Sequence, residues 1–310
     1  MPGTKDEIKH ELKPLLVKFE KEMGYTSAQG TRDHAALLDG MHLEATRIGI
    51  PYPENSHAWH AFHAGSNYAY LCYPNLPLEV RVYTGIFTWI AIIVDDYAKK
   101  DPEEWHQFIP RFLTGAKHHN EVAREWERCL RLAYQHYEPV AANFFITAAL
   151  NFTNACALEG SELPKLTPTA GGENFAYYLR DKNGVAEAYA WMNFPKAIFP
   201  DVSCYLEAVP DITKYICFAN DIMSFYKEES VGETDNYMHI RATYENVDVY
   251  DVFRQVIEET VDAHRRIKLV LEGKDPYAQL WQDHALGFVS FHTTSDRYKL
   301  RDLCLNESLP

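Results

Sequence analysis

Residues 220–229 read Asn-Asp-Ile-Met-Ser-Phe-Tyr-Lys-Glu-Glu, and the interpretation of the whole chain starts from this stretch. In a helix, Asn220, Ser224 and Glu228 recur every fourth residue and therefore lie on one face, one turn (~5.4 Å) apart. An amide oxygen, a hydroxyl and a carboxylate suit a hard cation, and their single formal charge favours Mg²⁺ shared with an anionic ligand. An ordinary polar face is the alternative, but Asn and Ser are weak helix formers and the same helix carries Phe225. We therefore expect a metal-binding helix.

Two acidic residues, Asp95 and Asp96, follow the apolar run Ile-Phe-Thr-Trp-Ile-Ala-Ile-Ile-Val at 86–94. A helix that is apolar on nearly every side is buried, so these carboxylates should emerge at the edge of an apolar interior. A solvated helix end is the alternative, and it would be preferred for an isolated pair of aspartates. The apolar run favours metal binding instead, and so does the ladder of oxygen donors that Asn220, Ser224 and Glu228 form on one helix face. We expect the two segments to face each other across an apolar chamber and to hold Mg²⁺ on a phosphate-bearing substrate.

Four motifs, in this order, resemble those of class I terpene synthases, and most closely the trichodiene synthase group of fungal sesquiterpene cyclases. They are Asp95-Asp96 with Asp101, Arg180-x-x-Asn183-Gly184, Asn220-Asp221-x-x-Ser224-x-x-x-Glu228, and Arg297-Tyr298. Together they extend over most of the chain. The first motif reads DDYAKKD and departs from a strict DDxxD pattern, and Asp101 is equally explained as the cap of the next helix.

The resemblance implies three Mg²⁺ ions held by the following residues: Asp95 on one side and Asn220, Ser224 and Glu228 on the other. Asp221 belongs to the motif but is not expected to be a ligand. Asp96 is expected to pair with Arg297 when the site closes.

The resemblance also implies which residues hold the diphosphate. Arg180 would sense the departing group, and Asn183 would link it to a carbonyl near Gly184, whose dipole points at the reacting carbon. A residue without a Cβ suits the helix break expected there. The remaining diphosphate contacts would come from Lys227, Arg297 and Tyr298.

Aromatic residues make up 14% of the chain, including 20 tyrosines and 16 phenylalanines, which is more than packing alone needs. Some should therefore line the cavity, although any one such residue is more often plain core than a cation stabiliser: the candidates are Phe87, Phe152, Tyr215, Phe218 and Phe291. Relatives commonly have Trp at the position of Phe291, a difference that should alter the shape of the cavity more than its chemistry. The triplet His57, His60 and His63 resembles a zinc site, but steps of three drift around a helix and no fourth ligand is near, so we interpret these as ordinary helix residues.

Chain length, net charge and cysteine content limit the class of protein. With 310 residues and no linker, we expect one catalytic domain over residues 1–310. A net charge of −14 argues against nucleic-acid binding and requires bridging cations for a diphosphate. Six cysteines without a CxxC pair, the last at Cys304, indicate reduced thiols. The N-terminus is polar, and no apolar run approaches the ~20 residues that cross a bilayer. We expect a cytoplasmic enzyme without a membrane span, and a homodimer is left open.

Apolar residues at spacings of three and four predict an all-α fold, a single-domain helical bundle around a central apolar cavity. A loop containing two prolines and Gly171-Gly172 is expected at 161–173. The predicted helices cover 5–22, 33–48, 57–72, 79–97, 102–114, 121–137, 139–158, a segment ending near 181, a segment from the break at 183–184 to about 193, 209–229, 246–272, 275–290 and, after a bend, 292–302.

The resemblance implies ionisation of farnesyl diphosphate, isomerisation to nerolidyl diphosphate and 1,6-closure in a closed apolar cavity, where aromatic faces stabilise the cation. A geranyl diphosphate substrate or an acyclic product stays open. A chain-elongating prenyltransferase is a second hypothesis, but such enzymes usually carry two DDxxD motifs. An inactive isoprenoid-binding relative is a third, and the presence of every expected ligand argues against it.

Overall fold

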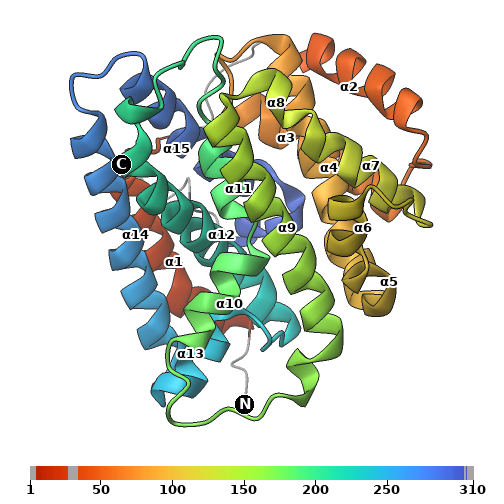
Figure 1. The fold of residues 1–310 in the computed structure, drawn as a ribbon. Coiled ribbons are helices and arrows are strands. Elements are labelled where there is room, and N and C mark those ends of the chain that lie inside the picture. Colours follow the sequence, from red (N-terminus) through yellow and green to blue (C-terminus); the bar gives the residue numbers. More distant parts are fainter. Residues whose placement is uncertain (1–4, 27–33, 304, 306–310) are drawn as a thin grey trace. The chain divides into compact units, whose positions relative to one another are not determined.

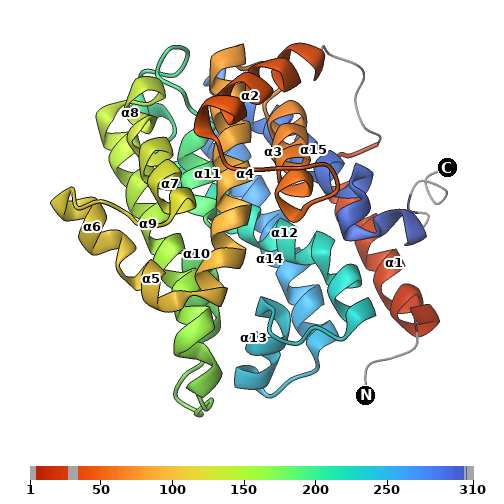
Figure 2. The same ribbon diagram turned by 90° about the vertical axis from the view of Figure 1, so that its right-hand side faces the viewer.

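The computed structural model describes residues 5–26, 34–303 and 305, and all regular structure among them is helical, as Figures 1 and 2 show. The predicted all-α fold is confirmed. The chain divides into two compact units. Unit 1 comprises Met1–Gly30, Pro168–Asp181 and Cys204–Pro310, and unit 2 comprises Thr31–Thr167 and Lys182–Ser203. The assignment of residues 1–310 to one catalytic domain stays a prediction.

Unit 2 is built round α4 (Leu78–Lys100), the helix that ends in the Asp95-Asp96 motif. It packs against α2, α3, α7 and α9 (Figure 2). A Cβ on Gly65 of α3 would overlap the carbonyl of Gly85 on α4, so these two helices meet at their backbones. The other helices of unit 2 are α2 (His34–Ile48), α3 (His57–Cys72), α5 (Pro102–His106), α6 (Phe108–Thr114), α7 (Glu121–Arg131), α8 (Ala133–His136), α9 (Pro139–Ser161), α11 (Ala186–Met192) and the 3₁₀ turn η1 (Leu163–Lys165).

Helix α9 is long and apolar enough, by length and composition alone, to cross a membrane. However, 61% of its most apolar stretch is buried inside the protein, as in a core helix. Its C-terminal turn approaches the end of α4 closely, because a Cβ on Gly160 would overlap the carbonyl of Lys99. This approach brings the last two turns of α9 beside the acidic motif of α4.

Unit 1 is built round α12 (Val209–Val231), the helix that carries the 220–229 stretch. It packs against α1 (Lys5–Glu22), α14 (Val249–Leu271) and α15 (Tyr277–Thr294) (Figure 1). The remaining elements of this unit are α13 (Tyr237–Glu245), which packs on α14, and the 3₁₀ turns η3 (Leu206–Ala208), η4 (Asp296–Tyr298) and η5 (Leu300–Leu303). Two of the four boundaries between the units fall within α10 (Phe175–Asn183) and within η2 (Val202–Cys204).

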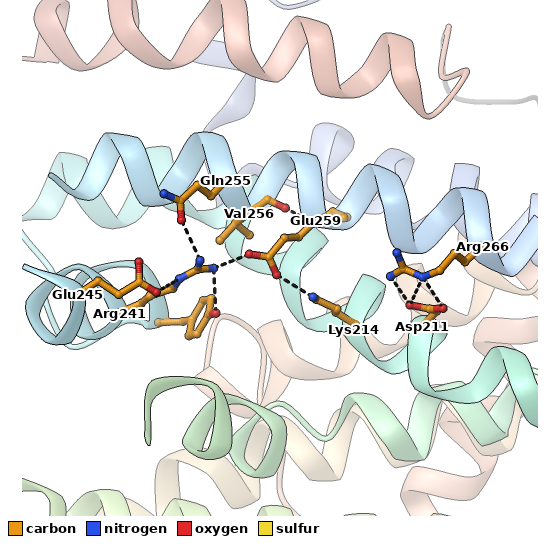
Figure 3. Close-up of polar contacts among 10 residues, drawn as sticks. Asp211, Lys214, Arg241, Glu245, Gln255, Val256, Glu259 and Arg266 are labelled. Atoms are coloured by element: carbon orange, nitrogen blue, oxygen red, sulfur yellow. Dashed lines mark hydrogen bonds and ion pairs between the residues drawn. The ribbon is translucent and has the colours of Figure 1, made fainter. Parts of the chain in front are cut away.

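Ion pairs tie α12 to α13 and α14, as Figure 3 shows. Glu259 of α14 accepts from Lys214 of α12 at 2.7 Å and from Arg241 of α13 at 2.8 Å. Further along the same helix, Arg266 of α14 lies 2.6 Å from Asp211 of α12. Lys214 and Arg241 outweigh burial and hold the pKa of Glu259 below its ordinary value. These contacts fix the three helices against one another.

Several predicted boundaries are wrong for local reasons. The helix predicted over 102–114 is split at Gln107, whose N–H returns to the carbonyls of Glu104 and Trp105, and the one predicted over 121–137 is split at Leu132. Helix α13 was not predicted; Asn236 caps it by accepting from the N–H of His239.

The C-terminal segment also differs from the prediction. Helix α15 runs without a break from Tyr277 to Thr294 and stops at Ser295, where two 3₁₀ turns replace the helix predicted over 292–302. Two parts of the sequence-based predictions, Asp33 at the start of the second helix and the thiol of Cys304, lie outside the described residues.

We predict that Glu259→Gln lowers the free energy of unfolding by about 1 kcal/mol at pH 7, a value that allows for the partial solvent screening of this pair. Because the pKa of Glu259 is lowered in the folded state, its stabilisation is present above the unfolded pKa near 4.5 and is lost as the pH falls through the folded pKa. Urea unfolding of both proteins should therefore show a difference at pH 7 that shrinks below pH 4.

Glu258→Gln is the matched control, since Glu258 is exposed on the same helix. It should change stability by less than about 0.5 kcal/mol. A Glu259→Gln difference that is as large at pH 3.5 as at pH 7 would contradict the ion-pair explanation.

Candidate functional site

The predicted ladder lies on α12 in unit 1. The backbone is helical throughout the 220–228 segment, so Asn220, Ser224 and Glu228 share one face. Ser224 is buried and the Glu228 side chain is 13% exposed. Burial raises the pKa of Glu228 to about 7, and a hydrogen bond from Ser224 opposes part of that rise. A partly buried carboxylate of this kind is held more easily in its charged form when a cation is close.

The donor set of this face is incomplete for a metal cage made by protein alone. Among the residues that the structure describes, no three His, Cys, Asp or Glu side chains gather as a metal site. The ammonium of Lys227 lies 3.9 Å from the carboxylate of Glu228 and 3.4 Å from that of Glu233. Oxygen donors with a single negative charge fit Mg²⁺ when an anionic ligand supplies the remaining charge.

A buried ion pair holds Arg180 of α10 against α12. The Arg180 Nε lies 2.8 Å from both carboxylate oxygens of Asp221, and its Nη2 also lies 2.8 Å from Oδ1. The two side chains are 13% and 10% exposed. Nη2 donates in addition to the carbonyl of Cys217 at 3.1 Å and to Oδ1 of Asn220 at 3.3 Å. Burial would lower the pKa of Arg180, but the Asp221 carboxylate outweighs it and keeps that pKa above its ordinary value.

Asp221 therefore holds the side chain of Arg180, the predicted diphosphate sensor, against α12. That Asp221 is not itself a metal ligand stays a prediction. Both Arg180 and Asp221 belong to motifs recognised in the sequence, but their pairing was not predicted.

Asn220 also contacts a residue that was not predicted, His292 of α15. The Asn220 Nδ2 lies 3.2 Å from Nε2 of His292, and Nδ1 of the same imidazole lies 2.8 Å from the carbonyl of Phe288. Burial lowers the pKa of His292 to about 4, so the ring is neutral near pH 7. The feature of the sequence that could have indicated His292 is its position next to Phe291 and five residues before Arg297.

The C-terminal basic pair lies on η4 in the same unit. Tyr298 is buried, and its ring centroid is 4.3 Å from that of His292 and 5.8 Å from that of Phe291. Arg297 is exposed. Unit 1 thus brings Tyr298 near the Asn220 end of the ladder through His292.

The first acidic motif lies in unit 2, within a polar network that the sequence did not predict. Asp95 is 40% exposed and accepts from Lys99 at 3.1 Å and from the thiol of Cys156 at 3.3 Å. Lys99 also lies 2.8 Å from Glu159 of α9, and Glu159 accepts a hydrogen bond from Asn183. Burial would lower the pKa of Lys99, but the two carboxylates outweigh it and raise that pKa. The predicted linker Asn183 is therefore joined to the Asp95 motif through two residues.

The other predicted residues of unit 2 have local partners. Asp96 lies 2.5 Å from Nε2 of His57, so this histidine of the predicted triplet contacts the acidic motif. Asp101 caps α5, with its carboxylate accepting from the N–H of Glu104 at 3.4 Å. The helix break after Asn183 is present, but the left-handed backbone falls on Val185, with φ 49°, and not on Gly184.

The five aromatic candidates are all buried, and each contacts other rings. In unit 2, Phe87 contacts Phe145, Tyr189 and Trp126, and Trp126 also contacts Phe152. In unit 1, Tyr215 contacts Trp281 and Phe288, Phe218 stacks on Tyr237, and Phe291 contacts Tyr298. The hydroxyl of Tyr215 donates to the carbonyl of Ala285 at 3.3 Å. These contacts are those of core residues, and the lining of a cavity by the five stays a prediction.

We predict that Asp221→Asn and Arg180→Met each lower the free energy of unfolding by about 3 kcal/mol, because either change leaves a buried group without its partner. The double variant should lose at least about 1 kcal/mol less than the sum of the two single losses, as expected for residues in direct contact. Chemical denaturation of the four proteins at pH 7 measures this coupling. Strictly additive losses would mean that the pair does not hold α10 to α12.

Comparison with known proteins shows the family of the chain. The family model described as Trichodiene synthase (TRI5) matches residues 60–308. The chain is 34% identical over 301 residues to Longiborneol synthase CLM1 of Gibberella zeae, covering 96% of this chain and 89% of the relative. It is 35% identical over 226 residues to Monoterpene synthase 25 of Postia placenta, covering 73% and 68%. Among solved structures, a linalool/nerolidol synthase from Streptomyces clavuligerus in complex with 2-fluorogeranyl diphosphate has a similar fold, with a TM-score of 0.65 at 10% identity over 88% of this chain and 98% of that one. The chain therefore belongs to the trichodiene synthase family and is a terpene synthase with the all-helical class I fold.

Proposed function

We propose that this terpene synthase is a Mg²⁺-dependent sesquiterpene synthase, which ionises farnesyl diphosphate and releases diphosphate and a cyclic sesquiterpene. The observation that carries the proposal is the stripe of Asn220, Ser224 and Glu228 on α12, with Arg180 held beside its first member. An oxygen stripe with one carboxylate needs an anionic co-ligand, and a diphosphate provides one. The family to which the chain belongs implies a prenyl diphosphate substrate.

The residues that would hold Mg²⁺ are those predicted from the sequence: Asp95, Asn220, Ser224 and Glu228, with three ions in all. Bound Mg²⁺ would supply Lewis-acid neutralisation of the leaving diphosphate. Asp95 now accepts from Lys99, so in this proposal Lys99 gives up part of that contact when the metal binds. The Lys99–Glu159 pair would keep the ammonium neutralised meanwhile.

Cationic and phenolic groups would receive the leaving group. Arg180 is fixed by Asp221, so its guanidinium is oriented before substrate arrives and loses little side-chain entropy on binding. Lys227 and Arg297 would add charge-assisted hydrogen bonds, and the hydroxyl of Tyr298 would add a neutral one. Preorganised donors of this kind stabilise the charge that develops on the diphosphate oxygens as the C–O bond breaks.

The carbocation left behind must be kept from water. We propose that Phe87, Phe152, Tyr215, Phe218 and Phe291 contribute aromatic faces to the chamber, with isomerisation to nerolidyl diphosphate preceding 1,6-closure. Asn183 and the carbonyl near Gly184 would complete the sensing segment, and Asp96 would pair with Arg297 on closure. We also propose that both units belong to one catalytic domain, since a single solved chain of the same fold covers 88% of this protein.

A monoterpene synthase acting on geranyl diphosphate is the second candidate, and the similarity to Monoterpene synthase 25 favours it. The experiment that separates the two is incubation of the protein with Mg²⁺ and either farnesyl or geranyl diphosphate, followed by gas chromatography and mass spectrometry of a hexane extract. A cyclic C15 hydrocarbon supports the proposal. A C10 product alone supports the second candidate, and a longer prenyl diphosphate formed with added isopentenyl diphosphate would indicate chain elongation.

We predict that Glu228→Gln lowers the rate of diphosphate release at least about a hundredfold, because it removes the only charged donor of the stripe. The melting temperature should not fall, since burial raises the pKa of this carboxyl and its ionised form is costly to bury. Release of diphosphate in a coupled assay and thermal unfolding are the two measurements.

A pair of serines on α12 provides the matched control. Ser224→Ala should slow diphosphate release about tenfold or more, whereas Ser230→Ala should not, since the hydroxyl of Ser230 only donates to the carbonyl of Tyr226 in its own helix. Equal effects of the two substitutions, or an unchanged rate with Glu228→Gln, would remove this face of α12 from the metal site.

A further inference from the structure

Asn220 is held at both ends of its side-chain amide. Its Nδ2 lies 3.2 Å from Nε2 of His292, and its Oδ1 lies 3.3 Å from Nη2 of Arg180. His292 is fully buried and lies on α15, whereas Arg180 lies on α10. Two side chains of unit 1, one on α15 and one on α10, therefore contact opposite ends of one amide on α12.

The hydrogen-bonding chemistry of these partners allows one orientation of the amide. A guanidinium can only donate, so Arg180 requires the amide oxygen of Asn220 at its end. The NH₂ group at the other end faces Nε2 of His292, and because NH₂ only donates, Nε2 is the acceptor. The carbonyl of Phe288, 2.8 Å from Nδ1, can only accept, so Nδ1 carries the ring hydrogen. Both ends of the amide therefore require the same orientation.

We infer that His292 is a positioning residue for the metal site, which fixes the Asn220 amide with Oδ1 directed to the cation and NH₂ directed away from it. This inference rests on the proposed function, in which Asn220 is a Mg²⁺ ligand. An amide turned by 180° would present its NH₂ group and could not bind a cation. A carbonyl oxygen has two lone pairs, so Oδ1 can bind a cation while it still accepts from Arg180.

The Phe288 carbonyl is the last member of a chain of contacts that runs from Asn220 through His292. By holding the hydrogen on Nδ1, it sets the tautomer of His292, which sets the orientation of Asn220. The contact of Tyr298 with the imidazole, at a centroid distance of 4.3 Å, helps to hold the plane of the ring. A backbone group of α15 thereby determines which atom of Asn220 faces the metal.

Two substitutions test the two ring nitrogens of His292 one at a time, because each replaces only one of them. In His292→Gln the side-chain oxygen reaches the place of Nε2 and can accept from Asn220. In His292→Asn the shorter amide reaches only the place of Nδ1 and leaves Asn220 without its acceptor. The matched control is His284→Asn, the same change at a buried histidine two turns earlier on α15, which contacts the rings of Trp281 and Phe288.

The experiment is a calorimetric titration of the full chain with Mg²⁺ at saturating inorganic diphosphate, with thermal unfolding recorded for every variant. His292→Asn should weaken Mg²⁺ binding about tenfold or more, as removal of an outer partner of a metal ligand commonly does. His292→Gln should remain within about threefold of the unsubstituted protein, and His284→Asn should not change Mg²⁺ binding. In an Asn220→Ala background, His292→Asn should produce no further loss.

Four results would overturn the inference, and the fourth would overturn the proposed metal site as well. The first is His292→Asn with unchanged Mg²⁺ affinity, which would mean that Arg180 alone orients the amide. The second is His292→Gln as weak as His292→Asn, and the third is an equal loss in His284→Asn. If Asn220→Ala itself leaves Mg²⁺ binding unchanged, Asn220 is not a ligand and the proposed metal site fails together with the inference. A loss with Asn220→Ala and none with His292→Asn overturns the inference alone.

Discussion

A buried guanidinium and a buried carboxylate, Arg180 and Asp221, set the arrangement of the polar face of unit 1. Leaving either charge buried without the other would cost several kcal/mol, so α10 and α12 can pack together only when this contact is made. Asn220 is the neighbour of Asp221 in sequence. The same contact therefore fixes the direction in which α12 presents the face with Asn220, Ser224 and Glu228. A residue that is not expected to bind metal thus determines where the expected ligands lie.

Much of this arrangement could be predicted because it depends on local periodicity. The recurrence of Asn220, Ser224 and Glu228 at every fourth residue fixes a shared face once the segment is helical, and the segment is helical. The apolar run before Asp95 likewise predicts a buried helix, and α4 is the central helix of unit 2. Helix boundaries were less certain, since α13 and the end of α15 depend on single capping residues, Asn236 and Ser295.

The partners of the site residues could not be predicted, because they come from distant parts of the chain. His292 contacts Asn220 across 72 positions, and Arg180 contacts Asp221 across 41. Neither residue type indicates such a contact by itself, since a lone histidine in an apolar helix is usually a core residue. The pairing of Lys99 with Glu159 is similar: it depends on the close approach of α9 to α4 at Gly160, which only the packed structure reveals.

The turn between α10 and α11 has a separate consequence. Val185 adopts φ 49° and ψ 14°, a left-handed conformation in which a β-branched residue costs on the order of 1–3 kcal/mol. The packing of the flanking helices must offset that strain. Asparagine adopts this conformation far more readily. Because Val185 is also buried, asparagine would relieve the backbone only by placing an amide in the interior, so heat tolerance improves there only if that amide finds a hydrogen-bond partner.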